Sequence, residues 1–358
     1  MRKFIIIFLT FIFLFFTSPV YSQWYEQALP VGGSMYDMVF FDANTGIISL
    51  DSKNVIRTTN GGNNWTIVLQ TKLSNLKKVD DSAAFGQGLN TGSNLVIKTT
   101  NRGLTWDSTG GTALSVRDFY FVNRDTGWFS AFGGSMGILK STDGGQTMFG
   151  ISTGASFGVI NFLNKKYNGE YFGWHVNELG LRLSTNSGIN WYKPSTDLDS
   201  LNLVSVTFIN KDTGWVSGTT NFTYGRIYYT SNGGLNWLKQ YEEFINGSPT
   251  SINFRTFNKG WGGRDDFKIF ATSNGGSTWG FQSIPINGIR KVFMIDTLVG
   301  WCGRSKLLHT TNGGGNIVAI KNANGEIPLK YILKQNFPNP FNPTSIIEFS
   351  IKEKSNIS

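Results

Sequence analysis

The chain has 358 residues, of which 43 are glycine, 9 are proline and 15% are aromatic, while only 15% are charged. These proportions favour many short strands joined by glycine turns, and they exclude a mostly helical protein, which carries more Ala, Leu, Glu and Lys. The net charge of +9 is spread along the chain with no basic run, and one cysteine with two histidines leaves no disulfide framework and no structural zinc site, so the composition argues against nucleic-acid binding and against a metal-stabilised fold.

The first 22 residues are typical of a secretory signal peptide. Arg2 and Lys3 form a basic start, and an apolar run follows from Phe4 to Phe16. This run is too short to span a membrane comfortably, and no later stretch is apolar enough to do so. Residues 1–22 are therefore predicted to be removed, so that an exported mature chain without a transmembrane segment begins at Gln23.

One turn pattern recurs seven times between residues 58 and 317. It consists of a hydroxyl residue, any residue, Asn or Asp, any residue, Gly, two variable residues and usually Trp. Met148 and Ile317 replace the Trp of the third and seventh copies. The Asx, Gly and Trp positions are Asn60, Gly62, Trp65, Asn101, Gly103, Trp106, Asp143, Gly145, Asn186, Gly188, Trp191, Asn232, Gly234, Trp237, Asn274, Gly276, Trp279, Asn312 and Gly314. The glycines recur roughly every 38 to 46 residues, which indicates a repeat architecture.

The chemistry of this box predicts a turn. The Asx side chain is expected to accept a hydrogen bond from the backbone N–H two residues later. The glycine is expected to adopt a positive φ, which a residue with a Cβ atom resists. Since the segments before the boxes are apolar, each box is predicted to join a third strand to a fourth.

A second hairpin motif precedes each box by about ten to fifteen residues. It is clearest at Phe121 to Trp128 (FVNRDTGW) and Phe208 to Trp215 (FINKDTGW), as a strand, an Asp-Thr-Gly turn and a strand. The copies in the second and fourth repeats are the most degraded. Two hairpins per repeat predict four-stranded antiparallel blades, so residues 23–317 are predicted to form an all-β, seven-bladed β-propeller.

The ends of the propeller are predicted to meet. The seventh box lacks its Trp, and the mature N-terminus supplies a segment, Trp24 to Leu29, that has the pattern of an unpaired fourth strand. We therefore expect this segment to pair into the seventh blade.

The repeated box resembles the Asp-box, or BNR repeat, of sialidases and sortilin-type propellers, although Asn replaces Asp in six of the seven copies. Together with the Asp-Thr-Gly-Trp hairpin, residues 24–317 look most like the propellers of the photosystem II assembly and stability factor family. In those families the box lies on the outer rim, away from the ligand face. The resemblance therefore implies an architecture and says little about activity.

A second resemblance lies at the C-terminus, after a polar linker at residues 318–329. Residues 330–358 resemble the start of the type A sorting domain of the type IX secretion system of Bacteroidota, a small β-sandwich. The motif residues are Gln335, Asn336, Pro338, Asn339, Pro340, Phe341, Asn342 and Pro343. The resemblance implies the type IX secretion machinery as a partner, and the outer-membrane surface or the medium as the destination. The chain ends after about the first two strands of that domain, so a truncated tail and a periplasmic location are the alternative.

Because sialidases share the box, a glycoside hydrolase is the alternative to a binding protein. The Phe-Arg-Ile-Pro signature of sialidases is absent, and no nucleophile elbow, phosphate loop or metal motif appears. Asp37 and Asp118 hold equivalent positions near the start of first strands, which line the channel of a propeller, and a glycosidase needs two such carboxylates. Ordinary channel polarity explains the pair as well, so no catalytic residue is assigned.

The favoured function is a secreted or cell-surface binding module, monomeric and without a cofactor, whose ligand is a protein, peptide or polysaccharide. In a propeller such ligands meet the loops between blades and between the second and third strands, and these loops carry charges of both signs here. The candidate binding residues are Asp37, Arg117, Asp118, Tyr224, Arg226, Arg264, Asp265, Arg290, Lys291 and Arg304. Solvation of loop ends is the competing explanation for each.

Overall fold

The computed structural model describes residues 23–88, 94–112, 115–132, 137–151, 158–220, 224–244, 249–264, 268–282, 284–286, 289–319, 332–333 and 349–350. The predicted signal peptide and the sorting motif at 335–343 lie outside these residues. None of the described segments forms a helix long and apolar enough to cross a membrane.

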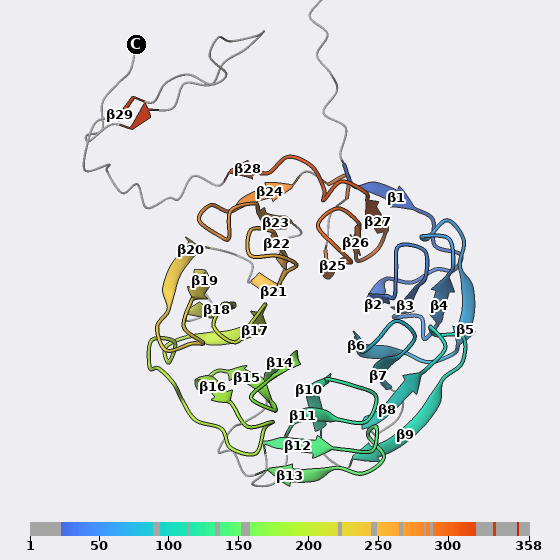
Figure 1. The fold of residues 1–358 in the computed structure, drawn as a ribbon. Helices are drawn as coiled ribbons and strands as arrows, with labels where there is room; N and C mark the ends of the chain where they lie inside the picture. The colour runs from blue at the N-terminus through green and yellow to red at the C-terminus, as the bar shows by residue number, and fades with distance from the viewer. Residues whose placement is uncertain are drawn as a thin grey trace, which may run out of the picture. The chain divides into compact units, whose positions relative to one another are not determined.

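The predicted seven-bladed β-propeller of antiparallel blades is confirmed (Figure 1). Blades 1 to 3 consist of β2 (Met35–Phe40), β3 (Gly46–Leu50), β4 (Val55–Thr58) and β5 (Thr66–Leu69); β6 (Leu73–Lys78), β7 (Ala84–Gly88), β8 (Asn94–Thr99) and β9 (Asp107–Thr112); and β10 (Ser115–Phe121), β11 (Gly127–Phe132), β12 (Ile138–Ser141) and β13 (Phe149–Ile151). In each blade the Asp-Thr-Gly type hairpin joins the first two strands and the box joins the last two, as the repeats predict.

Blades 4 to 7 follow the same order with two departures. Their strands are β14 (Val159–Tyr167), β15 (Glu170–Asn177) and β16 (Gly180–Ser184); β17 (Asn202–Phe208), β18 (Gly214–Thr220), β19 (Tyr224–Thr230) and β20 (Leu238–Phe244); β21 (Pro249–Phe254), β22 (Gly260–Arg264), β23 (Ile269–Thr272), β24 (Gly280–Gln282) and β28 (Val318–Ala319); and β25 (Lys291–Met294), β26 (Gly300–Gly303), β27 (Leu307–Thr310) and β1 (Tyr25–Gln27). In blade 4 the fourth strand is reduced to a single bridge between Leu183 and Tyr192. Blade 6 gains a fifth strand, β28, which consists of the two residues directly after the expected end of the propeller at 317. A further short pair, β29 (Ile332–Leu333) with β30 (Phe349–Ser350), lies within the predicted sorting segment.

The chain divides into two compact units. Unit 1 comprises residues 1–108, 267–269 and 282–316, and therefore holds blades 1 and 7 and blade 2 without the end of β9. Unit 2 comprises residues 109–266, 270–281 and 317–358, and holds blades 3 to 5 and most of blade 6. The contacts described below lie within one unit or the other.

The hydroxyl residue, rather than the Asx side chain alone, organises the box. In the first box, Thr58 Oγ1 accepts the Gly62 N–H at 2.9 Å and donates to Asn60 Oδ1 at 3.0 Å. Asn60 Oδ1 then accepts the N–H of Asn64, four residues later, at 2.9 Å. The prediction that the Asx side chain accepts the N–H two residues later is therefore wrong, because the Thr58 hydroxyl oxygen accepts that N–H instead.

Each box also ties the two hairpins of its own blade together. The N–H of the residue after the Asx position donates to a carbonyl in the first hairpin turn, as in Gly61 N to Asn44 O and Gly233 N to Asp212 O, both at 2.8 Å. The same bond recurs in all seven blades. Because these polar groups are satisfied by one another, the box residues have structural roles.

Neighbouring blades are joined by stacked aromatic rings. In four pairs of neighbouring blades, the Trp that follows the glycine of the first hairpin stacks on a Phe of the next blade, with ring centroids 3.5 to 3.8 Å apart: Trp301–Phe40, Trp128–Phe162, Trp174–Phe208 and Trp215–Phe254. The glycine before the Trp makes room for the Phe of its own hairpin. A Cβ atom on Gly214, for example, would lie 2.4 Å from the Phe208 ring.

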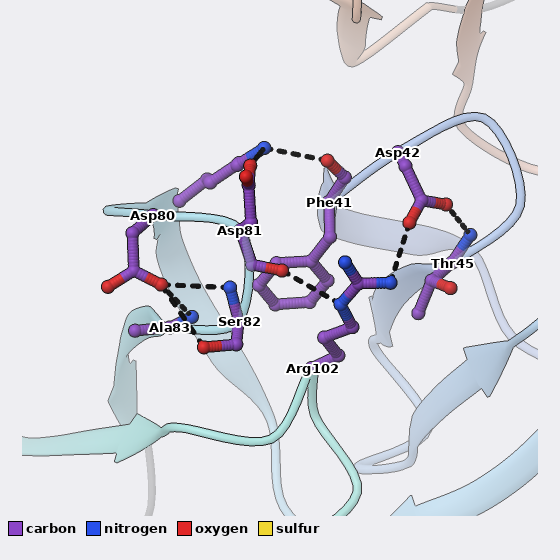
Figure 2. A network of polar contacts seen from close by, with 9 residues as sticks. Phe41, Asp42, Thr45, Asp80, Asp81, Ser82, Ala83 and Arg102 are labelled. Carbon is purple, nitrogen blue, oxygen red and sulfur yellow. Dashed lines mark hydrogen bonds and ion pairs between the residues drawn. The ribbon is translucent and has the colours of Figure 1, made fainter.

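Polar contacts join blades 1 and 2, where this stack is missing. Ile47 takes the Trp position of blade 1, and Lys78 takes the Phe position of blade 2. Lys78 Nζ instead donates to the Phe41 carbonyl at 2.6 Å. Figure 2 shows Arg102, from the second box, pairing with Asp42 at 2.7 Å and donating to the Asp81 carbonyl at 2.8 Å. Although burial opposes it, the pKa of Asp42 is lowered, since the carboxylate accepts the N–H groups of the turn and faces Arg102.

The segment that begins at Trp24 completes blade 7 as predicted. Strand β1 pairs antiparallel with β27, placing Tyr25 opposite His309. Trp24 is 1% exposed, lies beside Gly314 of the seventh box and donates from Nε1 to Gln282 at 3.1 Å. Tyr25 Oη lies 2.5 Å from His309 Nδ1, and burial lowers the pKa of His309 to about 4, so this contact involves a neutral imidazole.

Removal of residues 23–30 is expected to lower Tm by about 5 °C or more, because it deletes a strand and a buried indole. The control is Glu26→Gln, which removes only the exposed ion pair with Lys306 and should change Tm by less than about 1 °C. Thermal denaturation followed by circular dichroism checks both. An unchanged Tm in the truncated protein would contradict the role of β1.

Candidate functional site

The candidate binding residues of unit 1 meet at the start of β2. Asp37 is 8% exposed. Its Oδ2 accepts the N–H of Leu76, from β6, at 2.8 Å, and its Oδ1 accepts the Met38 N–H at 2.8 Å and an ion pair from Lys291 Nζ, from β25. The carboxylate therefore links three strands from three blades.

Tyr36 lies next to this ion pair, and two cationic side chains lie over its ring. The register between β2 and β3 shifts between Met35 and Asp37, so Tyr36 is the extra residue of a β-bulge, a feature that redirects a side chain. Lys72 Nζ lies 3.7 Å from the centroid of the Tyr36 ring, and the guanidinium carbon of Arg290 lies 3.9 Å from it. We call Tyr36, Asp37, Lys72, Arg290 and Lys291 the Tyr36 cluster. Arg304 lies beside it, since its carbonyl accepts the Met35 N–H at 2.5 Å.

Sequence reasoning found three members of the cluster and missed Tyr36 and Lys72. Tyr36 precedes Asp37 in the same way as Arg117 precedes Asp118 and Arg290 precedes Lys291. This shared position in the repeat could have identified Tyr36 from the sequence. Lys72 lies in the connection between blades 1 and 2, where no repeat position marks it.

The residues equivalent to Asp37 have a structural role as well. In unit 2, Asp118 Oδ2 accepts the N–H of Ile160 at 3.0 Å, and Ser205 Oγ accepts the N–H of Ile252 at 3.1 Å. Each bond runs from the first strand of one blade to the first strand of the next. The acids that the sequence offers as a catalytic pair are thus engaged in holding blades together.

The remaining candidate residues are divided. Arg117, Tyr224 and Arg226 belong to unit 2, whereas the Tyr36 cluster belongs to unit 1. Arg117 is exposed at a β-bulge, while Arg226 pairs with Glu242 at 2.5 Å. The Arg264 side chain and Asp265 lie outside the described residues.

A buried serine–histidine contact also joins two blades. Ser130 Oγ lies 3.0 Å from His175 Nε2 and accepts the Gly158 N–H at 2.9 Å, and neither Ser130 nor His175 is exposed. Burial lowers the pKa of His175 to about 3. Because Ser49 Oγ accepts the Leu73 N–H at 2.8 Å in the same way, the serine acts as a link between blades and is out of reach of a substrate. Over the described part of the chain, no three His, Cys, Asp or Glu side chains lie close enough together to hold a metal ion.

Comparison with known proteins identifies relatives by structure. No protein-family model and no curated protein matches this chain. The solved structure of YCF48 bound to D1 peptide is similar with a TM-score of 0.60 and 16% identity, over 82% of this chain and 96% of that one. YCF48 from Cyanidioschyzon merolae gives 0.56 and 15%, over 81% and 98%.

A glycoside hydrolase, the GH74 xyloglucanase from Xanthomonas campestris, is similar as well, with a TM-score of 0.64 and 11% identity over 82% of this chain and 54% of that one. At these identities the comparisons show the propeller fold alone. They support the expected likeness to photosystem II assembly factor propellers at that level.

The variant Asp118→Ala is expected to lower the free energy of unfolding by about 1–3 kcal/mol, since the buried Ile160 N–H loses its acceptor. The variant Asp118→Asn keeps a carbonyl oxygen in the same place and should lose less than half as much. Urea denaturation of both variants checks this. Equal stability of Asp118→Ala and the parent protein would contradict the structural role of the carboxylate.

Proposed function

We propose that the protein is an exported, non-catalytic binding propeller, and that the Tyr36 cluster docks an acidic segment of a partner protein. The observation that carries the proposal is the pair of cations at 3.7 and 3.9 Å from the Tyr36 centroid. A cation is attracted to the face of an aromatic ring. The N–H groups of that cation that point away from the ring can still donate hydrogen bonds to a carboxylate. Arg290 is exposed, so an incoming carboxylate can reach it.

The charges of the cluster favour an anion. Lys72, Arg290 and Lys291 stand against the single carboxylate of Asp37, and that carboxylate is already bonded by Lys291 and two N–H groups. Lys72 and Arg290 therefore remain to attract a ligand. A pair of positive groups held in place by one ring suits two neighbouring carboxylates better than a neutral surface.

The comparisons support a peptide as the ligand. The YCF48 structure with a bound D1 peptide has the same fold as this chain, so a propeller of this kind has room for an extended segment. The engagement of Asp37 and Asp118 in bonds between strands supports the absence of catalysis.

Export is the part of the proposal that rests on sequence alone. The basic and apolar start of residues 1–22 and the tail at Gln335–Pro343 support passage through the type IX secretion system to the outer-membrane surface or the medium.

The test of binding uses a fluorescent peptide of alternating Glu and Ser and an isosteric peptide with Gln in place of Glu. The acidic peptide should bind more tightly, and Lys72→Ala and Arg290→Ala should each weaken it about fivefold or more by fluorescence anisotropy. The control is Lys98→Ala, a lysine of unit 1 outside the cluster, which should bind as the parent does. Equal affinity for the two peptides, or indifference to Arg290→Ala, would refute the assignment.

Glycoside hydrolysis is the second candidate, because the xyloglucanase shares the fold. A hydrolysis screen with neutral and sialylated glycans separates it from binding. Turnover that disappears in a folded double variant, Asp37→Asn with Asp118→Asn, would establish an enzyme.

A further inference from the structure

Blade 4 carries a cavity of about 390 Å³ that none of the candidate binding residues lines, although Asn232 of the fifth box does. It lies at the end of blades 4 and 5 where their first hairpin turns and boxes are found, and its lining belongs entirely to unit 2. The volume is within the range of about 300–1,000 Å³ for small-molecule sites. A second cavity, beside Trp106, has a volume of about 210 Å³ and is below that range.

The two irregularities of blade 4 create this cavity. Strands β14 and β15 are nine and eight residues long, so their hairpin extends further than in the other blades and places Tyr167 and Phe172 as one wall. The fourth strand is reduced to the bridge at Tyr192, which leaves the opposite side open. The irregularities that the sequence shows as degradation of the repeat thus produce a concave surface.

Aromatic side chains form the walls, and they are held in place. Tyr167 and Phe172 meet edge to face with centroids 5.6 Å apart. The backbone of Tyr192 is held by two hydrogen bonds with Leu183, at 2.8 and 3.0 Å, while 47% of the residue is exposed. The following loop is anchored by Leu198, which is buried. Rigid aromatic surfaces open to solvent are the groups that pack on the C–H face of a sugar ring.

Polar groups of both signs lie between these walls. Lys211 Nζ contacts both carboxylate oxygens of Asp212 at 2.8 Å, and both side chains are about half exposed, at 43% and 50%. Asn232 Oδ1 accepts the Asn236 N–H at 3.0 Å. In boxes 2 and 6 the equivalent amide nitrogen donates to a threonine; in box 5 that threonine is replaced by Asn236, and within the described residues the Asn232 amide nitrogen has no such bond.

We propose that this cavity binds a neutral carbohydrate, through packing of sugar rings on Tyr192, hydrogen bonds that sugar hydroxyls donate to Asp212, and a hydrogen bond that the Asn232 amide nitrogen donates to a sugar oxygen. A ligand with net charge gains little from a lining in which Lys211 and Asp212 neutralise each other. A purely apolar ligand would displace water from the half-exposed Asp212 carboxylate and from the Asn232 amide nitrogen without replacing its hydrogen bonds. A neutral sugar has both an apolar face and hydroxyl groups that donate and accept, so it satisfies both kinds of lining.

Titration calorimetry of the full chain tests this with four neutral tetrasaccharides: cellotetraose, xylotetraose, mannotetraose and chitotetraose. At least one should bind, and Tyr192→Ala should weaken that binding roughly tenfold or more, as truncation of a central aromatic contact does. Asp212→Asn should weaken it as well, by removing a charged acceptor. The matched control is Phe149→Ala, an aromatic residue of unit 2 that is 49% exposed and lies outside the cavity.

Absence of binding to all four tetrasaccharides would overturn the proposal, and so would binding that Tyr192→Ala leaves unchanged. Folding is checked by Tm, which Tyr192→Ala should preserve because the backbone bonds at this bridge remain. The same variant should bind the acidic peptide as the parent does, so that failure of this site and failure of the Tyr36 cluster give different results.

Discussion

The stacking of a Trp from one blade on a Phe of the next is the contact that joins four pairs of neighbouring blades. Each stack needs a glycine beneath the Phe, because a Cβ atom there would overlap the ring, as Gly214 shows for Phe208. Stacked pairs of this kind contribute about 0.5–1.5 kcal/mol beyond burial. The Asp-Thr-Gly-Trp motif is therefore one device, in which the turn, the glycine and the Trp each serve the contact between blades.

Most of the fold was predictable because its determinants are local and repeated. The box and the first hairpin each occupy a few consecutive residues, so their strands and turns follow from the sequence. The contacts missed are those between distant residues. Lys78 and Arg102 join blades 1 and 2 in place of a stack (Figure 2), and β28 returns to pair with β24. No periodic pattern marks either.

In the candidate sites, too, the local features were predictable from the sequence and the contacts between distant residues were not. Asp37 and Asp118 were visible as equivalent polar positions, yet their role in bonding the next blade depends on Leu76 and Ile160, which are far along the chain. Tyr36 and Lys72 meet only because a bulge and a connection between blades bring them together. The repeated residues form contacts that join neighbouring blades. A binding function is therefore expected where the repeat pattern is irregular, at the Tyr36 cluster and beside Tyr192.

The most direct test of this account is a double-mutant cycle on Trp215 and Phe254, with each residue changed to Leu and stability measured by urea denaturation. The rings stack at 3.5 Å with an interplanar angle of 6°. The account predicts a coupling free energy of about 0.5–1.5 kcal/mol between the two changes. Additive losses, with coupling near zero, would contradict the claim that stacking between blades holds this propeller together.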